Sequence, residues 1–528
     1  MRLRNTFRVL GLILVAALAI GVAGCGPSEV EDPGSTTGGV ATFRLNGDFS
    51  GLNPLGNTDG NTYQVWAFIA ETLIRHQPDN SWTGQLAETW DLSEDGKTYT
   101  FNLRHGVKWH DGEDFNADDV LFTWELHWDP EVNEVNQYTW MVDGEPIEMV
   151  KVDEYTIKMI LPKPYPAVLE SLKWFIPVPE HLLKDVPRAE IVNCELGAAP
   201  IFTGPFKFTE YKPGEYVKLT AFEDYWGGKP GLDEAIFRIL ADENSAAIAL
   251  ETGQIDWGRI SAASFDRLKN GGKVSINQEI SGRVVLLQVG QTGPNQDFFQ
   301  DATIRQALSH LVDRETIANT IMKGLVQPGY NVMVPTDLYY TEDIVKYEYN
   351  IDKGKELLTD AGWSLGEDGV LTKDGKRFEV DLFYQTGDAL TDQTALLMQN
   401  AFGQAGIKLN LRGLERTALV QHLVDDDYDL ILNGNLMGPD PHRYVYIYGD
   451  RSPEIEALFA AGQKETDETE RARIYAEIQM LISEQAYNIP LYYPDSLHAH
   501  NPKLNVGEAE VHGGVYHFYN PVKIRFEK

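Results

Sequence analysis

Segments with the alternating pattern of β-strands and segments with the periodicity of α-helices follow one another along this 528-residue chain. Thr98–His110 ("TYTFNLRHGVKWH") alternates and is rich in β-branched and aromatic side chains, which predicts a strand. Asp301–Gly324 instead spaces its apolar residues along one helical face, with Asp301 as the N-cap and Gly324 as the stop. More strands are predicted at Glu379–Gln385 and Ile407–Leu414, and a helix at Asp352–Gly362. The alternation predicts a mixed α/β fold.

Length and charge limit the classes of protein to which the chain can belong. A chain of this length, more than about 300 residues, exceeds the size at which a single hydrophobic core stops growing, so more than one lobe is expected. The formal net charge is −34, and 43% of the residues are hydrophobic. A globular body of this charge repels nucleic acid and anionic membrane surfaces, so neither is expected as a ligand.

The N-terminus has the anatomy of a secretory signal. Three arginines fall within the first eight residues, and Val9–Ala23 is an uncharged apolar run that is short for a membrane span. Val22–Cys25 resembles the lipobox of bacterial lipoproteins, in which the cysteine is acylated and becomes the new N-terminus. We therefore expect a signal peptide at 1–24, and a lipidated Cys25 with a flexible tether at 25–40. An uncleaved membrane anchor is the alternative interpretation.

A dense set of motifs identifies a family. It begins with Leu86–Glu125, "LAETWDLSEDGKTYTFNLRHGVKWHDGEDFNADDVLFTWE". Further motifs follow at Thr203–Phe208, Asp224–Ile239, Ala249–Asp256, Asp301–Glu315, Asp352–Trp363 and Tyr428–Gly434. In this order they resemble the family 5 extracellular solute-binding proteins, the dipeptide, oligopeptide and nickel binders of ABC importers. The resemblance covers the chain from about Ala41 to Lys528.

The resemblance implies an α/β, periplasmic-binding-protein-like fold (type II, cluster C-like) with two α/β lobes joined by a hinge and an extra inserted lobe. Lobe I would combine residues 41–61, 200–281 and 488–528, with lobe II inserted at 62–199. Lobe III would span 282–487. The chain would cross between lobes near Ser281 and Tyr487, and His110-Asp111-Gly112 would close a strand turn rather than contact ligand.

The resemblance also implies a function. A substrate-binding lipoprotein would capture a peptide or similar small solute by hinge closure, and would deliver it to the permease subunits of an ABC importer. The expected protein is a monomer, extracytoplasmic and held at the membrane only by its lipid. Neither catalysis nor a cofactor is expected.

One cleft segment of the peptide-binding members, which corresponds to Asn433–Asp450, differs in this chain. In those members it carries an aromatic residue, whose position here is Gly434 or Asn435. It also carries the acid that pairs with the peptide amine, whose position here is Met437 or Gly438. Asp440 is the substitute carboxylate, although an Asp between prolines also suits a turn. A missing carboxylate removes the charge-assisted bond to an amine, which favours a neutral or anionic ligand.

Other ligand-contacting residues are expected from the family register or from nearby segments. Arg416 occupies a position that carries Trp in peptide binders, and suits a carboxylate or a sugar hydroxyl. A surface arginine without a ligand is the alternative. Gln288 is expected on the first strand of lobe III, and core packing is the alternative for the aromatic residues. The remaining candidates are Asn433 and Asn435 for hydroxyl or amide recognition, and Trp66, Trp257 and Tyr384 as cleft walls.

Several rival interpretations stay open. An oligosaccharide-binding member of the same family is the main alternative, and an envelope adhesin or an enzyme is a rival from another class. Nickel binding is disfavoured because His498 and His500 fall on a returning strand of lobe I, and no metal site is expected. No nucleophile elbow, zinc-protease motif or Walker loop occurs. Cys194 is expected to be a buried, inert thiol.

Overall fold

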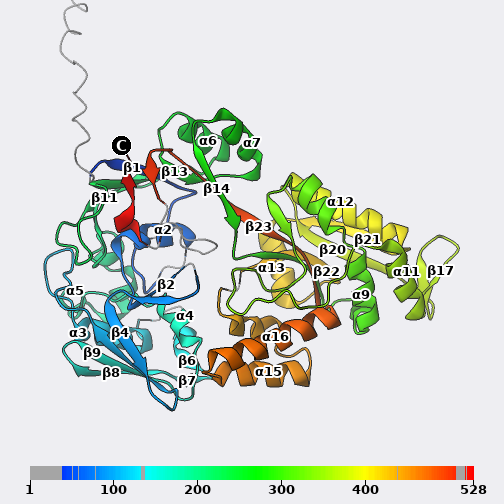
Figure 1. Cartoon of the computed structure of the whole chain (residues 1–528), viewed down its shortest axis with the longest axis horizontal. Coiled ribbons are helices and arrows are strands. Elements are labelled where there is room, and N and C mark those ends of the chain that lie inside the picture. The colour runs from blue at the N-terminus through cyan, green and yellow to red at the C-terminus, as the bar shows by residue number, and fades with distance from the viewer. Residues whose placement is uncertain are drawn as a thin grey trace, which may run out of the picture. The chain divides into compact units, whose positions relative to one another are not determined.

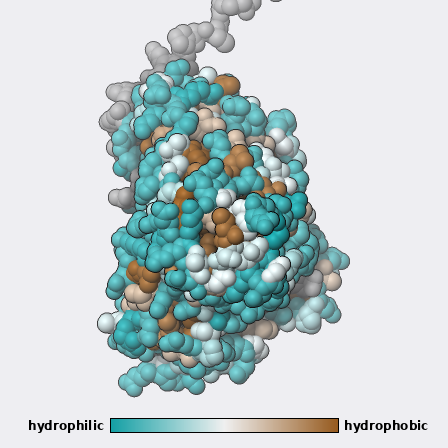
Figure 2. Space-filling view, turned by 90° about the vertical axis from the view of Figure 1, so that its right-hand side faces the viewer, coloured by the Kyte–Doolittle hydropathy of each residue, from teal (hydrophilic) through white to brown (hydrophobic). Residues whose placement is uncertain are grey.

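The computed structural model describes residues 38–49, 51–56, 59–77, 79–132, 137–436, 438–506, 518 and 520–527. The predicted signal peptide, Cys25, most of the tether and Met437 lie outside these residues. Among the described residues, no helix combines the length and apolarity needed to cross a bilayer. The face shown in Figure 2 is mostly hydrophilic, with hydrophobic residues in separate spots, as expected for a chain of this charge.

One long sheet organises the described chain, and β23 (Asn488–His500) lies at its centre (Figure 1). The first half of β23 pairs with β15 and β16, whereas its second half pairs with β13 and β14. The strand order is β10 (Phe206–Lys212), β11 (Tyr216–Ala221), β12 (Glu234–Ile239), β1 (Val40–Leu45), β13 (Trp257–Arg259), β23, β15 (Val284–Val289), β22 (Leu430–Asn435), β20 (Glu379–Gln385) and β21 (Lys408–Leu414), with β14 (Ser275–Ile280) and β16 (Val326–Pro328) also on β23.

The end of the sheet around β1 is held by aromatic packing. β1 runs parallel to β12 with Phe43 opposite Phe237, and the two rings stack with centroids 5.3 Å apart. Phe43 also contacts Phe68 and Trp257. The helices of this part are α2 (Gly60–Ile69), α6 (Glu243–Glu251) and α7 (Ala262–Gly271). Burial of each large aromatic side chain contributes about 2–3 kcal/mol, which makes this cluster the anchor of the region.

A separate antiparallel sheet lies between α2 and β10 in the sequence. Its order is β4 (Ala87–Leu92), β5 (Thr98–Leu103), β9 (Thr156–Ile160) and β8 (Glu148–Asp153). The predicted strand at Thr98–His110 is confirmed only as far as Leu103, because Gly106 takes a left-handed φ of 73° and turns the chain. Shorter elements are β2 (Ile74–His76), β3 (Trp82–Gly84), β6 (Met141–Val142), β7 (Glu145–Pro146), α3 (Ala117–Trp128), α4 (Val168–Leu172) and α5 (Glu180–Leu183).

The chain between β15 and β23 is rich in helices. The predicted helix at Asp301–Gly324 is three elements, because Asp313 caps a new turn through its contact with Thr316 N. Gly324 ends the run with a φ of 77°, as predicted. The helices are α8 (Gln296–Phe299), α9 (Ala302–His310), α10 (Arg314–Thr316), the π-helix η4 (Ile317–Ile321), α11 (Ile351–Asp360), α12 (Ala389–Gln404), α13 (Arg416–Asp425), α14 (Val445–Tyr448), α15 (Pro453–Lys464) and α16 (Glu468–Gln485).

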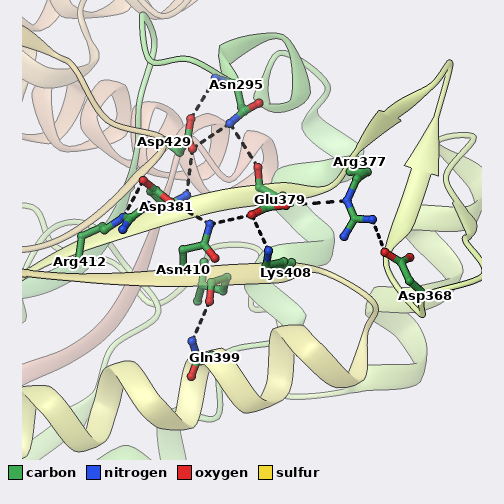
Figure 3. Close-up of polar contacts among 11 residues, drawn as sticks. Asn295, Asp368, Arg377, Glu379, Asp381, Gln399, Lys408, Asn410, Arg412 and Asp429 are labelled. Atoms are coloured by element: carbon green, nitrogen blue, oxygen red, sulfur yellow. Dashed lines mark hydrogen bonds and ion pairs between the residues drawn. The ribbon is translucent and has the colours of Figure 1, made fainter.

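A polar network ties the amino ends of the strands in this region (Figure 3). Asp429, just before β22, is buried and accepts from the backbone N of Asp381 (3.0 Å) and from Asn295 N and Nδ2 (3.0 and 2.9 Å). Asn410 on β21 donates to Glu379 and Asp381 on β20. These bonds hold β20, β21 and β22 in register, so this acidic cluster has a structural role.

Candidate functional site

The opposite, carboxyl ends of these strands meet at one edge of the sheet. β20 runs parallel to both β21 and β22, with Gln385 opposite Leu414. β15 runs antiparallel to β22, so its first residue, Val284, lies opposite Asn435 at the end of β22. Open α/β sheets bind ligands outside the carboxyl ends of their strands. We call this set of strand ends, with Arg283 before β15 and Arg416 after β21, the carboxyl edge.

Three predicted amide side chains form one cluster at the carboxyl edge. Gln288 Nε2 and Asn433 Nδ2 both donate to Asn435 Oδ1, at 3.1 and 2.9 Å. Asn435 Nδ2 is buried and has no hydrogen-bond partner among the described residues. An unmet buried donor costs about 1–3 kcal/mol. The Asn435 oxygen already accepts two hydrogen bonds, so the group that remains for a ligand is the Nδ2 donor. A ligand atom that binds there must be a hydrogen-bond acceptor.

Arginines surround the same edge. Arg416 is the first residue of α13 and is exposed, as is Arg283. The N-cap of α13, Glu415, makes no side-chain hydrogen bond to the first turn. Burial by surrounding protein lowers the pKa of Arg283, and the charge of Arg416 lowers it further. Desolvation and a neighbouring positive charge both disfavour the charged form of an arginine, so a negatively charged partner would be favoured here.

Two predicted cleft walls are core residues in the structure. Trp257 is fully buried and packs against Phe43, Phe518 and His498. Trp66 is 3% exposed, and its Nε1 donates to Leu52 O at 2.9 Å. Their indole rings complete the core, which was the alternative interpretation. Tyr384, by contrast, is half-buried near the end of β20, at the carboxyl edge.

Asp440 lies in a buried ion pair. Its two carboxylate oxygens accept from Arg471 Nη1 and Nη2, both at 2.9 Å, and Oδ1 also caps His442 N at 2.9 Å. The carboxylate is therefore buried and neutralised by Arg471, which makes it unavailable to a ligand amine in this conformation. Gly438 has a φ of 95°, and a Cβ there would come within 4.0 Å of Glu170 Oε2. That carboxylate is itself paired with Lys173 at 2.7 Å.

The histidine and cysteine side chains singled out in the sequence contact other residues of the protein. His498 contacts Ser496 Oγ at 3.3 Å, and His500 contacts Asn501 O at 3.0 Å. No group of three His, Cys, Asp or Glu suited to a metal occurs within the described part of the chain. Cys194 is half-buried and forms no disulfide, and Asn53 Nδ2 lies 3.8 Å from its sulfur.

Residues 81–454 match the family described as bacterial extracellular solute-binding proteins, family 5. The match spans well over half of the chain. The chain belongs to this family. The chain is similar to the oligopeptide-binding protein AppA of Bacillus subtilis, 26% identical with 94% of both chains covered. The nickel-binding periplasmic protein of Escherichia coli is 27% identical, with 83% of this chain and 86% of that protein covered.

Solved structures confirm the α/β fold of this family 5 solute-binding protein. The ABC transporter substrate-binding protein CtaP of Listeria monocytogenes superposes with a TM-score of 0.84 at 29% identity, covering 93% of this chain and all of CtaP. AppA of Bacillus subtilis, solved with a nonapeptide, gives 0.73 at 26% identity, covering 93% and 99%. The fold expected from the resemblance is therefore confirmed, whereas the ligand residues stay predictions.

Sequence reasoning missed two arginines of this family 5 protein, Arg259 and Arg283. Arg283 follows Ser281, where the chain was expected to cross between lobes, and Arg259 ends the short strand β13. Burial lowers the pKa of Arg259, and the charge of Arg283 is the next cause. The proximity of Arg283 to the expected crossing was the available signal. Nothing local to Arg259 marks it in the sequence.

Proposed function

We propose that this family 5 protein is the substrate-binding lipoprotein of an ABC importer and captures a peptide or similar small solute at the carboxyl edge. The unpartnered Asn435 donor at the carboxyl edge, to which Arg283 and Arg416 also belong, carries this proposal. Relatives named for oligopeptide binding, and one solved with a nonapeptide, support it. The protein acts as a monomer, without catalysis, and hands its ligand to permease subunits.

Hinge closure is part of the proposal. Lobe I comprises 41–61, 200–281 and 488–528, lobe II comprises 62–199, and lobe III comprises 282–487. β23 pairs with strands of lobes I and III, and Ser281 N donates to Pro494 O beside the crossing. Contacts of lobe II with lobe III include Asn80 Nδ2 to Thr336 O and Gln463 Nε2 to Asp143 Oδ1, both 3.0 Å. Such polar contacts exchange with water as lobes move.

An oligosaccharide is the second candidate ligand, and one observation favours it. Gln288, Asn433 and Asn435 bring three amide groups together. Amides both donate and accept, which suits sugar hydroxyls. A peptide amine, in contrast, finds no free carboxylate at Asp440.

Small-angle scattering on the soluble body from Gly26, with and without ligand pools, tests the proposal. A pool of mixed tetrapeptides and a pool of oligosaccharides are the two probes. We expect a smaller radius of gyration with one pool, and release of that solute, chemically unchanged, from the denatured complex. Compaction with sugars alone would replace peptide by oligosaccharide. No compaction with either pool, or release of a converted product, would contradict the proposed function.

A further inference from the structure

Three arginines with no polar partner act on one another electrostatically, and two of them, Arg283 and Arg416, belong to the carboxyl edge. The chain holds 45 Lys and Arg against 79 Asp and Glu, so carboxylates are plentiful. The guanidinium groups of Arg259, Arg283 and Arg416 nevertheless form no hydrogen bond or ion pair among the described residues. All three are exposed. They differ from Arg471, which is paired with Asp440, and from Arg314, whose guanidinium donates to backbone carbonyl oxygens.

The topology explains why the three arginines gather. Arg259 pairs with His498 on the second half of β23, whereas Arg283 precedes β15, which pairs with the first half. Arg416 follows β21, which ends at the same edge at which β15 begins. The charge of Arg416 acts on Arg283, and that of Arg283 acts on Arg259. Two halves of the sheet thus supply one group of cationic side chains.

The backbone of Arg259 is fixed by a buried arginine. Arg44 on β1 is 2% exposed, and its Nη1 donates to Arg259 O at 2.7 Å. The charge of Arg44 is met by Glu243, with Nη2 to Oε1 at 3.0 Å. Glu243 is therefore already engaged, and Arg44 acts as a positioning residue for β13. The charge of Glu243 also raises the pKa of Arg259, but the two side chains form no ion pair, so the Arg259 guanidinium can bind another partner.

Two further features point the same way. α13 has ten residues, and its first turn receives no side-chain cap, so backbone N–H groups beside Arg416 stay open. Asn435 Nδ2 supplies an additional unmet donor at the same edge. Cationic side chains, helix N–H groups and an amide N–H all bind a negatively charged hydrogen-bond acceptor favourably.

We propose that the solute captured at the carboxyl edge carries an oxyanion, a carboxylate or a phosphate, which Arg259, Arg283 and Arg416 bind across the two halves of the sheet. This inference rests on the proposed function and names the class of its ligand. Because the arginines come from both halves, an oxyanion stabilises the arrangement in which they approach each other, and mutual repulsion opposes that arrangement without ligand.

Thermal unfolding with two simple probes tests the proposal. Citrate and inorganic phosphate are added to the soluble body from Gly26, against sodium chloride of equal ionic strength. We expect at least one of them to raise the Tm by about 1 °C or more beyond the effect of chloride. A ligand at about ten times its Kd stabilises the folded protein enough to be measured. A response to citrate assigns a carboxylate ligand, and a response to phosphate assigns a phosphorylated one.

Matched variants separate this site from a general salt effect. Arg283→Gln and Arg416→Gln should each weaken the apparent affinity for the active probe about tenfold, because each removes a charge-assisted bond. Arg283→Lys keeps the charge and should retain most of the response. Arg412→Gln is the control, because this arginine, four residues before Arg416, is paired with Asp381 at 2.9 Å in the network of Figure 3.

Two results would overturn the oxyanion site. One is a Tm that responds to citrate and phosphate no more than to chloride. The other is an equal response in wild type, in both Gln variants and in Arg412→Gln. If a tetrapeptide or oligosaccharide pool still compacts the protein, the proposed function survives the loss of the oxyanion site. If neither pool compacts the protein but the arginine-dependent response is present, the site stands and the proposed function fails.

Discussion

His110 is buried, and both of its ring nitrogens have partners. Nδ1 accepts from Phe202 N at 3.2 Å, so the ring proton sits on Nε2, which donates to Gly204 O at 3.0 Å. Burial lowers the pKa of His110 to about 4. The ring is therefore neutral at pH 7 and fastens two loop residues to the strand turn. This agrees with the structural role expected for His110-Asp111-Gly112.

The depressed pKa of His110 makes stability depend on pH. Its contribution is complete above the unfolded pKa, about 6.5, and is lost as the pH falls towards about 4. Between pH 7 and pH 5 we expect wild type to lose about 2 kcal/mol more unfolding free energy than His110→Asn, which has no proton to gain. Urea unfolding at the two pH values measures this. Equal losses in both proteins would show that His110 does not titrate in this window.

At the scale of elements, the backbone that follows β15 packs directly against the backbone that precedes β22. Gly290 follows β15, and its N donates to Asp429 O at 3.0 Å. A Cβ at Gly290 would lie 1.9 Å from Tyr428 O, so only glycine fits without a shift of the backbone. Gly403 on α12 is the opposite case, since a Cβ there meets nothing within 4 Å.

Alanine at these two glycines should therefore change stability in opposite directions. Gly290→Ala is expected to cost about 1–3 kcal/mol, because the clash involves backbone atoms. Gly403→Ala is expected to add about 0.5–1 kcal/mol, because alanine lowers the entropy cost of forming the helix. Urea unfolding midpoints of the two variants provide the measurement. A stabilised Gly290→Ala would mean that β15 and β22 are not held this closely in solution.

On the scale of the whole molecule, charge and attachment act together. A body with net charge −34 is repelled by anionic lipid surfaces, so it does not adsorb to the membrane by itself. We propose that acylated Cys25 and the tether at 25–40 supply the attachment. A diacylated cysteine provides the second chain that stable anchoring requires. Such an anchor would keep the body near the proposed permease.

Cys25→Ser should release the protein from the membrane. In a bacterial host fed labelled palmitate, wild type is expected in the membrane fraction with label, and Cys25→Ser in the soluble fraction or as uncleaved precursor, in either case without label. Cys194→Ser is the matched control and should behave as wild type, because that half-buried thiol lies within the folded body. Equal labelling of wild type and Cys25→Ser would disprove lipidation at Cys25.

Local chemistry was readable from the sequence, whereas long-range pairing was decided only by the tertiary structure. The cap at Asp301 and the stop at Gly324 depend on neighbours a few residues away, so residue type alone determines them. The ion pair of Asp440 with Arg471 joins residues that are 31 positions apart in the sequence, and no local pattern predicts it. The family motifs indicated the fold, because they span most of the chain. The grouping of Arg259, Arg283 and Arg416 required the pairing of β23 with both halves of the sheet, since charges meet only where strands distant in sequence are brought together.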